Sequence, residues 1–185
     1  QVVLVDTGGK GSLSPIADGL SALNVSLSKL SLIVLTHYHP DHSGSLDKVV
    51  EASSGKVAVH QEDAGVVRGK EPMSRLFRNN LLEKVTQPLL SRLYGGPVEV
   101  DHILNDQDRL PVQEDITVIH TPGHTAGSIC LYMASKGVLI VGDAMQYRLR
   151  RLGPPAASVT ASPQQALESL EKLLSLDFDT ICFSH

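Results

Sequence analysis

The six residues from His37 to His42, His-Tyr-His-Pro-Asp-His, constrain this chain more than any other part of its sequence. They hold three imidazoles and one carboxylate, and they follow Leu30–Leu35, a largely apolar run of strand length. Pro40 argues against a helix here, because proline lacks a backbone amide donor. Imidazole and carboxylate are ligands that suit zinc, iron or manganese. A solvated loop has no need for this density of ligands, so the segment predicts a metal site.

Three further candidate ligands lie at the ends of other predicted strands. His124 follows a strand-like run and lies in a turn rich in proline and glycine. The glycines permit a tight turn of the backbone, and the proline makes it rigid. Asp143 follows the apolar run Gly137–Gly142, and His185 follows Thr180–Phe183. Taken alone, an aspartate at a strand exit serves equally well as a helix cap. Together with the first cluster, these positions predict a site assembled on strand ends.

The rest of the chain alternates strand-like and helical patterns, which is typical of an α/β fold. In the second half, two apolar runs are separated by a short turn around Ala134–Lys136 and are predicted to pair in antiparallel fashion. The predicted strands are Val2–Val5, Leu30–Leu35, Lys56–His60, Asp115–His120, Ser128–Met133, Gly137–Gly142 and Thr180–Phe183, and the predicted helices begin at Ser14, Ser45 and Ser162.

The last predicted helix has the clearest start signal. Ser162 is placed to cap it, Pro163 occupies the first helical position, and Gln165 completes the capping-box pattern. Apolar residues then recur at helical spacing. The leucines expected to form its buried stripe are Leu167, Leu170, Leu173 and Leu174.

Residues 72–94 interrupt the alternation with apolar residues at helical spacing. Pro88 is expected to kink or divide this helix, and the glycines that follow Tyr94 end it. We therefore expect a helical insertion within a single domain that covers residues 1–185. It either packs on the core as an amphipathic helix or acts as a lid or partner-binding element.

Composition excludes several classes of protein. Hydrophobic residues make up 42% of the chain and charged residues 19%, which rules out a disordered polypeptide. The net charge of −4 offers no basic field for nucleic acid or anionic lipid, and no apolar run is long enough to span a bilayer. We therefore expect a cytoplasmic protein that acts on a small molecule. Cys130 and Cys182 lie in apolar runs and are expected to be buried thiols, with a single disulfide between them as the alternative.

The ends of the sequence carry an expectation of their own. The chain starts at Gln1 directly before a strand-like run and stops at His185 directly after another. Native chains seldom begin and end within secondary structure without tails. We therefore expect residues 1–185 to be part of a longer chain.

The ordered motifs resemble the metallo-β-lactamase-fold superfamily of metal-dependent hydrolases, in its glyoxalase II-like, zinc-dependent branch. The residues that carry the resemblance are Asp6-Thr7-Gly8, the His-x-His-x-Asp-His run from His37, the Thr-Pro-Gly-His-Thr turn around His124, Gly142-Asp143 and His185. The resemblance extends from residue 2 to residue 185. It implies an α+β (or α/β) fold, a four-layer αββα sandwich, here without its first strand or strands and without its C-terminal end.

The resemblance also implies two metal ions, zinc in the first instance, with iron or manganese as alternatives. The matching ligands are His37, His39 and His124 for the first ion, Asp41, His42 and His185 for the second, and Asp143 as the bridge between them. Asp41 is in addition the candidate catalytic residue, which orients the nucleophile and takes its proton. Asp6 either orients a ligand histidine or caps the turn after the first strand.

The implied activity is hydrolysis of a small ester, thioester or lactone by a hydroxide that bridges the two ions. The alternatives are a phosphodiesterase or nuclease of the same fold, which the negative charge disfavours, and an iron-dependent oxidoreductase that uses the same ligands. The segment after Asp143 lacks the Gly-Cys-Gly pattern of glutathione thioesterases and persulfide dioxygenases, which disfavours both. Tyr147 is a further candidate near the site, placed to assist a substrate carbonyl, and His60 is expected at the border of the pocket. An anionic group of the substrate has three candidate partners, Arg148, Arg150 and Arg151. His102 and His120 are expected to be ordinary residues.

Overall fold

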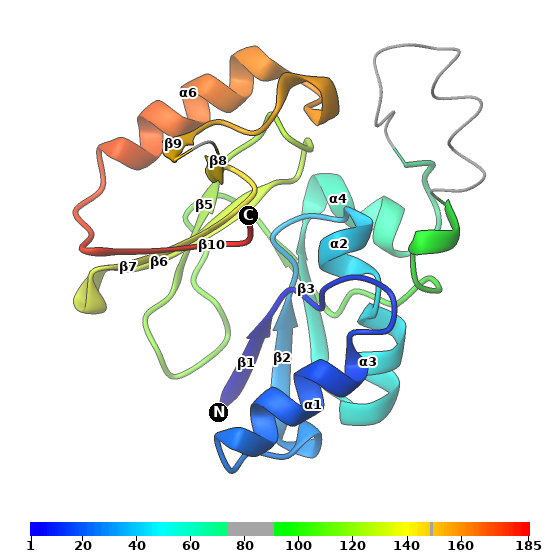
Figure 1. Cartoon of the computed structure of the whole chain (residues 1–185). Coiled ribbons are helices and arrows are strands. Elements are labelled where there is room, and N and C mark those ends of the chain that lie inside the picture. The colour runs from blue at the N-terminus through cyan, green and yellow to red at the C-terminus, as the bar shows by residue number, and fades with distance from the viewer. Residues whose placement is uncertain (74–90, 149) are drawn as a thin grey trace.

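The computed structural model describes residues 1–73, 91–148 and 150–185 (Figure 1). The predicted helical insertion over 72–94 therefore lies largely outside the described residues, although Ser91–Leu93 forms one short 3-10 turn, η2. Within the described ranges, none of the helices combines the length and the hydropathy needed to cross a membrane.

Two four-stranded sheets form the centre of the fold (Figure 1). The first sheet is parallel, with the order β1 (Val2–Val5), β2 (Leu30–Val34), β3 (Lys56–His60) and β4 (His102–Leu104). The second has the order β10 (Thr180–Phe183), β7 (Val138–Gly142), β6 (Ile129–Met133) and β5 (Thr117–His120). Strand β10 runs parallel to β7, and the other pairs are antiparallel, including the predicted β6–β7 pair. A separate hairpin joins β8 (Gln146–Arg148) to β9 (Arg151–Gly153).

Alternation along β2 shows how the layers are stacked, because successive strand residues point to opposite faces. Ile33 packs with Val49 of α3 (Leu46–Ser53) in an outer core. Val34 faces the other way and packs with Val118 and Leu131 of the second sheet. Both faces of the strand are thus buried, as its apolar run predicts. The order of layers is helix, sheet, sheet, helix, which confirms the predicted αββα sandwich.

Two helices of the first layer, α1 and α3, lie close to the predicted positions, whereas α2 and α4 were not predicted. They are α1 (Leu13–Ala22), α2 (Pro40–Ser43), α3 (Leu46–Ser53) and α4 (Gln61–Val67), with a short 3-10 turn, η1 (Leu27–Lys29), before β2. Helix α1 has Ser12 at its N-cap position, so the prediction that Ser14 caps it is wrong by two residues. Ser12 is fixed there because its backbone N–H donates to Ser45 Oγ.

The capping of α6 (Pro163–Leu174) follows the sequence prediction, since the Ser162 side chain accepts a hydrogen bond from the Gln165 N–H. The predicted buried stripe of leucines on this helix is wrong for two of its four residues. Leu173 is buried and Leu170 packs against the same core, but Leu167 and Leu174 are exposed. The buried positions are instead Ala166, Ser169 and Leu173.

The turn that holds His124 accounts for this shift of the buried face. Ser169 Oγ of α6 donates to the Pro122 carbonyl at 2.7 Å, and the Ser162 N–H donates to the Gly123 carbonyl at 2.8 Å. A Cβ atom at Gly123 would lie only 2.3 Å from the Ala166 backbone nitrogen. The first turns of α6 therefore rest directly on this loop, and small residues face it.

The cysteines differ from each other in burial. Cys130 is buried and free, as predicted, and burial raises its pKa to about 12. Cys182 is also free, but it is exposed, so the prediction of a buried thiol is wrong for this residue. It lies on β10 at the edge of its sheet, where Ile181, rather than Cys182, points into the core under α6.

Replacing Gly123 by alanine is expected to lower the free energy of unfolding by about 3 kcal/mol, because it combines backbone strain with overpacking. The φ angle at Gly123 is +137°, and the new methyl group would collide with the backbone of Ala166. Urea unfolding followed by circular dichroism measures the change. Gly19→Ala is the matched control, since the space around Gly19 is open and alanine favours its helix. Equal stability of G123A and the parent chain would contradict the close contact between the loop and α6.

Candidate metal centre

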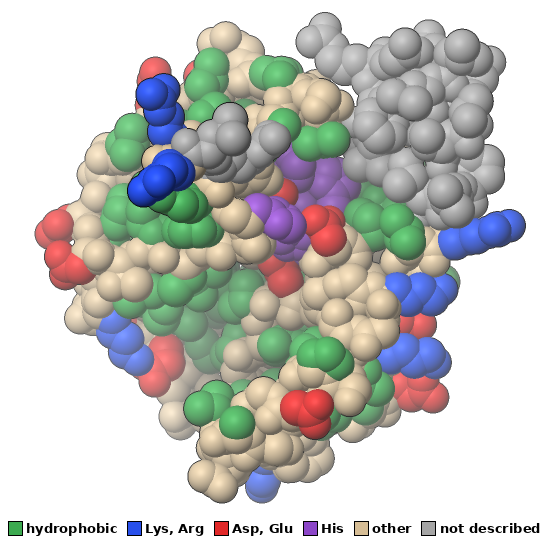
Figure 2. Space-filling view, viewed as in Figure 1, with side chains coloured by type: hydrophobic (Ala, Val, Ile, Leu, Met, Phe, Trp, Pro, Cys, Tyr) green, Lys and Arg blue, Asp and Glu red, His purple; other side chains and the backbone are tan. Residues whose placement is uncertain are grey.

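All seven proposed ligands converge at one end of the two sheets. The segment 37–42 follows β2, His124 follows β5, Asp143 follows β7 and His185 follows β10. In Figure 2, histidine and acidic side chains gather at one place on the surface, in a hollow between the two halves of the molecule. Strand ends that are far apart in sequence thus supply one cluster, as predicted.

The segment after β2 contains one unexpected element, the helical turn α2 (Pro40–Ser43), which carries Asp41 and His42. The prediction that Pro40 excludes a helix is wrong. Proline occupies the first helical position, where its missing amide hydrogen would have no helical partner and its fixed φ angle suits the helix.

The first group of ligands, His37, His39 and His124, is buried, and its candidate ligand atoms lie within 4.8 Å of one another. His39 Nδ1 and His124 Nε2 are 2.9 Å apart. Burial, together with the neighbouring imidazoles, lowers the pKa of His37 well below its ordinary value and that of His39 to about 3. Burial likewise lowers the pKa of His124. These three imidazoles are therefore neutral at pH 7, which is the form that binds metal.

The second group, Asp41, His42 and His185, lies at the rim of the site. His185 Nε2 is 3.1 Å from Asp41 Oδ2, and His42 Nε2 is 3.8 Å from the same oxygen. His42 is buried, but the side chains of Asp41 and His185 are 53% and 44% exposed. The second group is thus open to solvent, unlike the first.

Asp143 lies between the two groups and is buried. Its Oδ2 is 3.4 Å from His124 Nε2, and its Oδ1 is 3.3 Å from His42 Nε2 and 3.5 Å from His185 Nε2. Burial alone would raise the pKa of Asp143, but the hydrogen bond with His42 and the nearby imidazoles lower it. This carboxylate is therefore ionised and faces both groups.

Asp6 orients the His42 ring through the nitrogen that does not face Asp143. Its Oδ2 is 2.8 Å from His42 Nδ1, and its two oxygens accept hydrogen bonds from the Thr36 N–H and hydroxyl. The hypothesis that Asp6 orients a ligand histidine agrees with its contact with His42. Its other side-chain bonds go to Thr36 at the end of β2 and not to the turn after the first strand, which the alternative hypothesis had it cap. Burial would lower the pKa of His42, but hydrogen bonds and charges from Asp143 and Asp6 raise it to about 10. Binding of a metal ion by His42 therefore requires the loss of this proton.

Several buried polar atoms of the cluster are poorly satisfied by hydrogen bonds within the protein. His37 Nε2 is buried in this cluster without a hydrogen-bond partner, and neither His42 Nε2 nor Asp143 Oδ1 has a closer partner than the other, at 3.3 Å. A buried polar atom without a partner costs about 1–3 kcal/mol, so native structures seldom leave several in one place. Imidazole nitrogens and carboxylate oxygens that converge in this way suit divalent zinc, iron or manganese. The residues present therefore fit the metal ions that the sequence motifs imply.

Gln146 was missed by sequence reasoning. Its Nε2 donates a 3.0 Å hydrogen bond to Asp143 Oδ2, and Gln146 itself is buried. The next residue, Tyr147, donates its backbone N–H to the His185 carbonyl. The start of β8 thus holds two proposed ligands, and a glutamine three positions after Asp143 is a weak sequence signal for such a role. The Tyr147 side chain is half exposed and lies beside Phe183.

His60 and His120 form a stacked pair outside the ligand groups. Their ring centroids are 4.0 Å apart, and His60 Nδ1 accepts a hydrogen bond from the Glu62 N–H at the start of α4. Burial and the neighbouring His120 lower the pKa of His60 to about 4. Neither residue belongs to a ligand group among the described residues.

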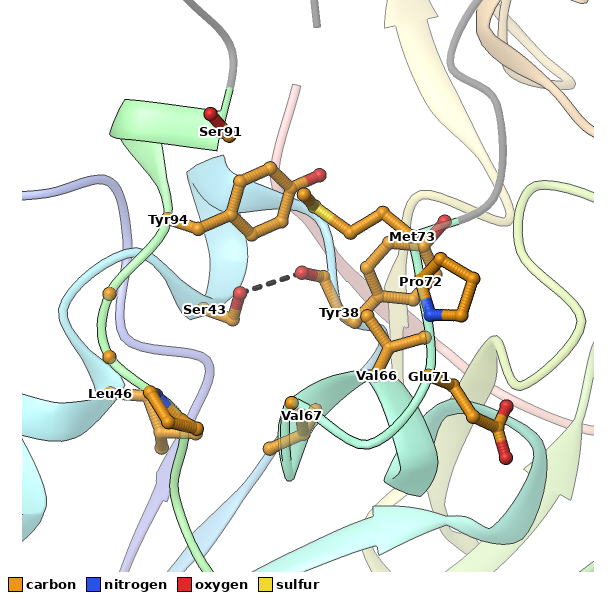
Figure 3. Close-up of a pocket in the computed structure, with 14 residues that line it drawn as sticks. Tyr38, Ser43, Leu46, Val66, Val67, Glu71, Pro72, Met73, Ser91 and Tyr94 are labelled. Carbon is orange, nitrogen blue, oxygen red and sulfur yellow. Dashed lines mark hydrogen bonds between the residues drawn. The ribbon is translucent and has the colours of Figure 1, made fainter. Parts of the chain in front are cut away.

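A cavity of about 420 Å³ adjoins the cluster on the side of Tyr38 (Figure 3). Apolar side chains such as Val66, Val67 and Met73 line it together with Tyr94, and none of the seven proposed ligands does. The Tyr38 ring is 5.0 Å from the ring of His39, so it stands between the cavity and the first ligand group.

Comparison with known proteins now identifies the family. A family model described as the metallo-beta-lactamase superfamily matches residues 1–185. The chain belongs to this superfamily. Members similar to it include the probable metallo-hydrolase YflN of Bacillus subtilis, 29% identical over 99% of this chain and 74% of that protein. The human acyl-coenzyme A thioesterase MBLAC2 is 31% identical over 78% of this chain and 54% of its own.

Two solved structures show the same fold. The subclass B3 metallo-beta-lactamase BJP-1 of Bradyrhizobium japonicum superposes with a TM-score of 0.72 at 21% identity, covering 99% of this chain and 67% of its own. TTHA1623 in a di-iron-bound form also gives a TM-score of 0.72, at 24% identity, covering 99% of this chain and 81% of its own. The superfamily sandwich predicted from the motifs is thereby confirmed.

Proposed function

We propose that this chain is a hydrolase that holds two divalent metal ions and cleaves a small-molecule ester, thioester or lactone. The observation that carries the proposal is the position of Asp143. A single buried carboxylate faces both a buried group of neutral imidazoles and an exposed group at the rim. Two cations close together repel each other, and a shared anion between them offsets that repulsion.

The metal ions, when bound, supply a water molecule of lowered pKa and polarise the oxygen atom of the substrate carbonyl. The protein residues hold and orient the reactants around them. His37, His39 and His124 hold the buried position, while Asp41, His42 and His185 hold the exposed one. The Asp41 carboxylate is half exposed to solvent at the rim of the site, so it is placed to orient the nucleophile and to accept its proton.

A thioester is the substrate class that we favour among the three. MBLAC2 is named as an acyl-coenzyme A thioesterase. The hydroxyacylglutathione hydrolase of Cereibacter sphaeroides is 31% identical over 85% of this chain and 49% of its own. It supports a thioester in general and not a glutathione thioester, because the segment after Asp143 lacks the Gly-Cys-Gly pattern of glutathione thioesterases. The net charge of −4 disfavours a nucleic-acid substrate. Iron in place of zinc remains the second candidate, because TTHA1623, a protein of the same fold, exists in a di-iron form. A cytoplasmic location stays a prediction.

A panel of substrates and metals tests the proposal. The chain is stripped with a chelator and reconstituted with Zn²⁺, Mn²⁺ or Fe²⁺, and each form is given an acyl thioester, a lactone and a phosphodiester. We expect no turnover without metal and thioester hydrolysis once Zn²⁺ is restored. Turnover by the stripped chain would contradict the metal-dependent mechanism, and cleavage of the phosphodiester alone would contradict the substrate class. Oxygen consumption that requires Fe²⁺ would favour the oxidoreductase instead.

A further inference from the structure

Asp63, in the first turn of α4, is almost completely buried, with 1% of its surface exposed. Its carboxylate accepts three hydrogen bonds. Oδ2 accepts from the Tyr38 N–H at 3.1 Å and from the Thr125 hydroxyl at 2.9 Å, and Oδ1 accepts from the Gly127 N–H at 2.8 Å. Every donor belongs to a loop rather than to α4 itself.

Those donors come from two loops, and each loop carries proposed ligands. Tyr38 lies between His37 and His39, and Thr125 directly follows His124. One carboxylate therefore joins the two segments that supply the first ligand group. The contact is also tight, because a Cβ atom at Gly127 would lie 2.5 Å from Asp63 Cγ. A glycine at this position lets the loop close onto the carboxylate.

The burial of Asp63 is unfavourable for the stability of the fold. Burial raises its pKa to about 6, although the hydrogen bonds from Thr125, Gly127 and Tyr38 act in the opposite direction. Since this pKa lies above the ordinary value, the stability that the group contributes is present at low pH and is lost as the pH rises through about 6. No salt bridge joins Asp63 to a cation in the described ranges. A buried charge of this kind calls for a role other than stability.

The second ligand group has its own anchor. The hydrogen bonds of Asp6 fix His42 and the end of β2, and the loop of His124 is held from elsewhere. Asp6 thus supports His42 and, through Thr36, the start of the His37 segment, whereas Asp63 joins this segment to the loop of His124.

We propose that Asp63 is a positioning residue, which joins the loops of His37, His39 and His124 and thereby sets the affinity of this group for its metal ion. The inference rests on the proposed function, because it presupposes a metal ion at the first group. It gives Asp63 no contact with the metal ion or with a substrate.

Asp63→Asn is the discriminating variant, since it keeps the size of the side chain but replaces one oxygen by an NH₂ group. In either orientation this NH₂ faces a backbone N–H, that of Tyr38 or that of Gly127. We expect Zn²⁺ affinity of the first group to fall by about 10- to 100-fold, as is typical when a partner of metal-binding residues is lost. The measurement is competition with a chelator in a His185→Ala background, which disables the second group. The visible absorption bands of bound Co²⁺ report ligand geometry and are expected to shift.

Asp101→Asn is the matched control, because Asp101 Oδ2 accepts a hydrogen bond from the Val57 N–H at the other end of β3. Thr125→Val removes one of the three bonds and is expected to weaken Zn²⁺ binding several-fold. The inference is overturned if D63N binds Zn²⁺ as tightly as its parent with unchanged Co²⁺ bands, or if D101N weakens binding equally. If D63N does not fold, unchanged affinity in T125V overturns it. Failure of the parent chain to bind any metal would overturn the proposed function, and this inference with it.

Discussion

Replacing Asp41 by alanine is expected to abolish hydrolysis, with a fall in kcat of about 1,000-fold or more, because a positioned proton acceptor alone contributes that much. The fold is expected to survive. The Asp41 side chain is half exposed and pairs with His42 and His185 at the rim, so its removal opens no cavity in the core. The stability change is expected to stay within about 0.5 kcal/mol.

Turnover of the thioester found active in the panel, together with metal content and a urea unfolding curve, checks this expectation. Asp115→Ala is the matched control. Asp115 is exposed to a similar extent, 51%, and pairs with Arg109 away from the ligand groups. Full activity in D41A would contradict the proposed role of Asp41. Equal loss in D115A would show that the effect has no relation to the site.

The second large effect is expected for Asp143→Asn. This change removes the one carboxylate that faces both ligand groups, while the shape of the side chain stays the same. Without its charge, two nearby cations lose the anion between them, so the chain is expected to retain at most one metal ion instead of two. Turnover is expected to fall by about 1,000-fold or more, since proton transfer and electrostatic stabilisation both depend on the assembled site.

Metal content after gel filtration, measured by atomic absorption, tests this expectation directly. Gln146→Ala is the companion variant, because it leaves the Asp143 carboxylate in place and removes only its 3.0 Å hydrogen bond. We expect Q146A to keep two ions and to lose activity only several-fold. Two ions retained by D143N would contradict the bridging role.

The ligand candidates were readable from the sequence because they are dense and ordered. Three imidazoles and a carboxylate within six positions are hard to account for without a metal ion, and strand ends are the usual place for such groups. The layers were expected from the resemblance to the superfamily, and the burial of β2 on both faces was predictable from its largely apolar sequence.

The residues that hold the ligands in place could not be predicted from the sequence, because their roles depend on contacts between distant segments. Asp63 is 25 residues from Tyr38 and 64 from Gly127 along the chain. In the sequence it is one acidic residue after a predicted strand, and the structure places it in the first turn of α4, a position that the helix dipole already favours. The buried face of α6 was missed in the same way. Leucine spacing predicts a stripe, but the close approach of Ala166 to Gly123 selects which part of it faces the core.

The contact between α6 and the His124 turn has a consequence for how this protein can change its activity. Bonds from Ser162 and Ser169 fix the backbone on one side of His124, and Asp63 fixes the Thr125 side. A larger residue at Ala166 would push on this turn without touching a ligand or a substrate. Libraries for directed evolution should therefore include the first two turns of α6, because variation there can adjust the geometry of His124 in small steps.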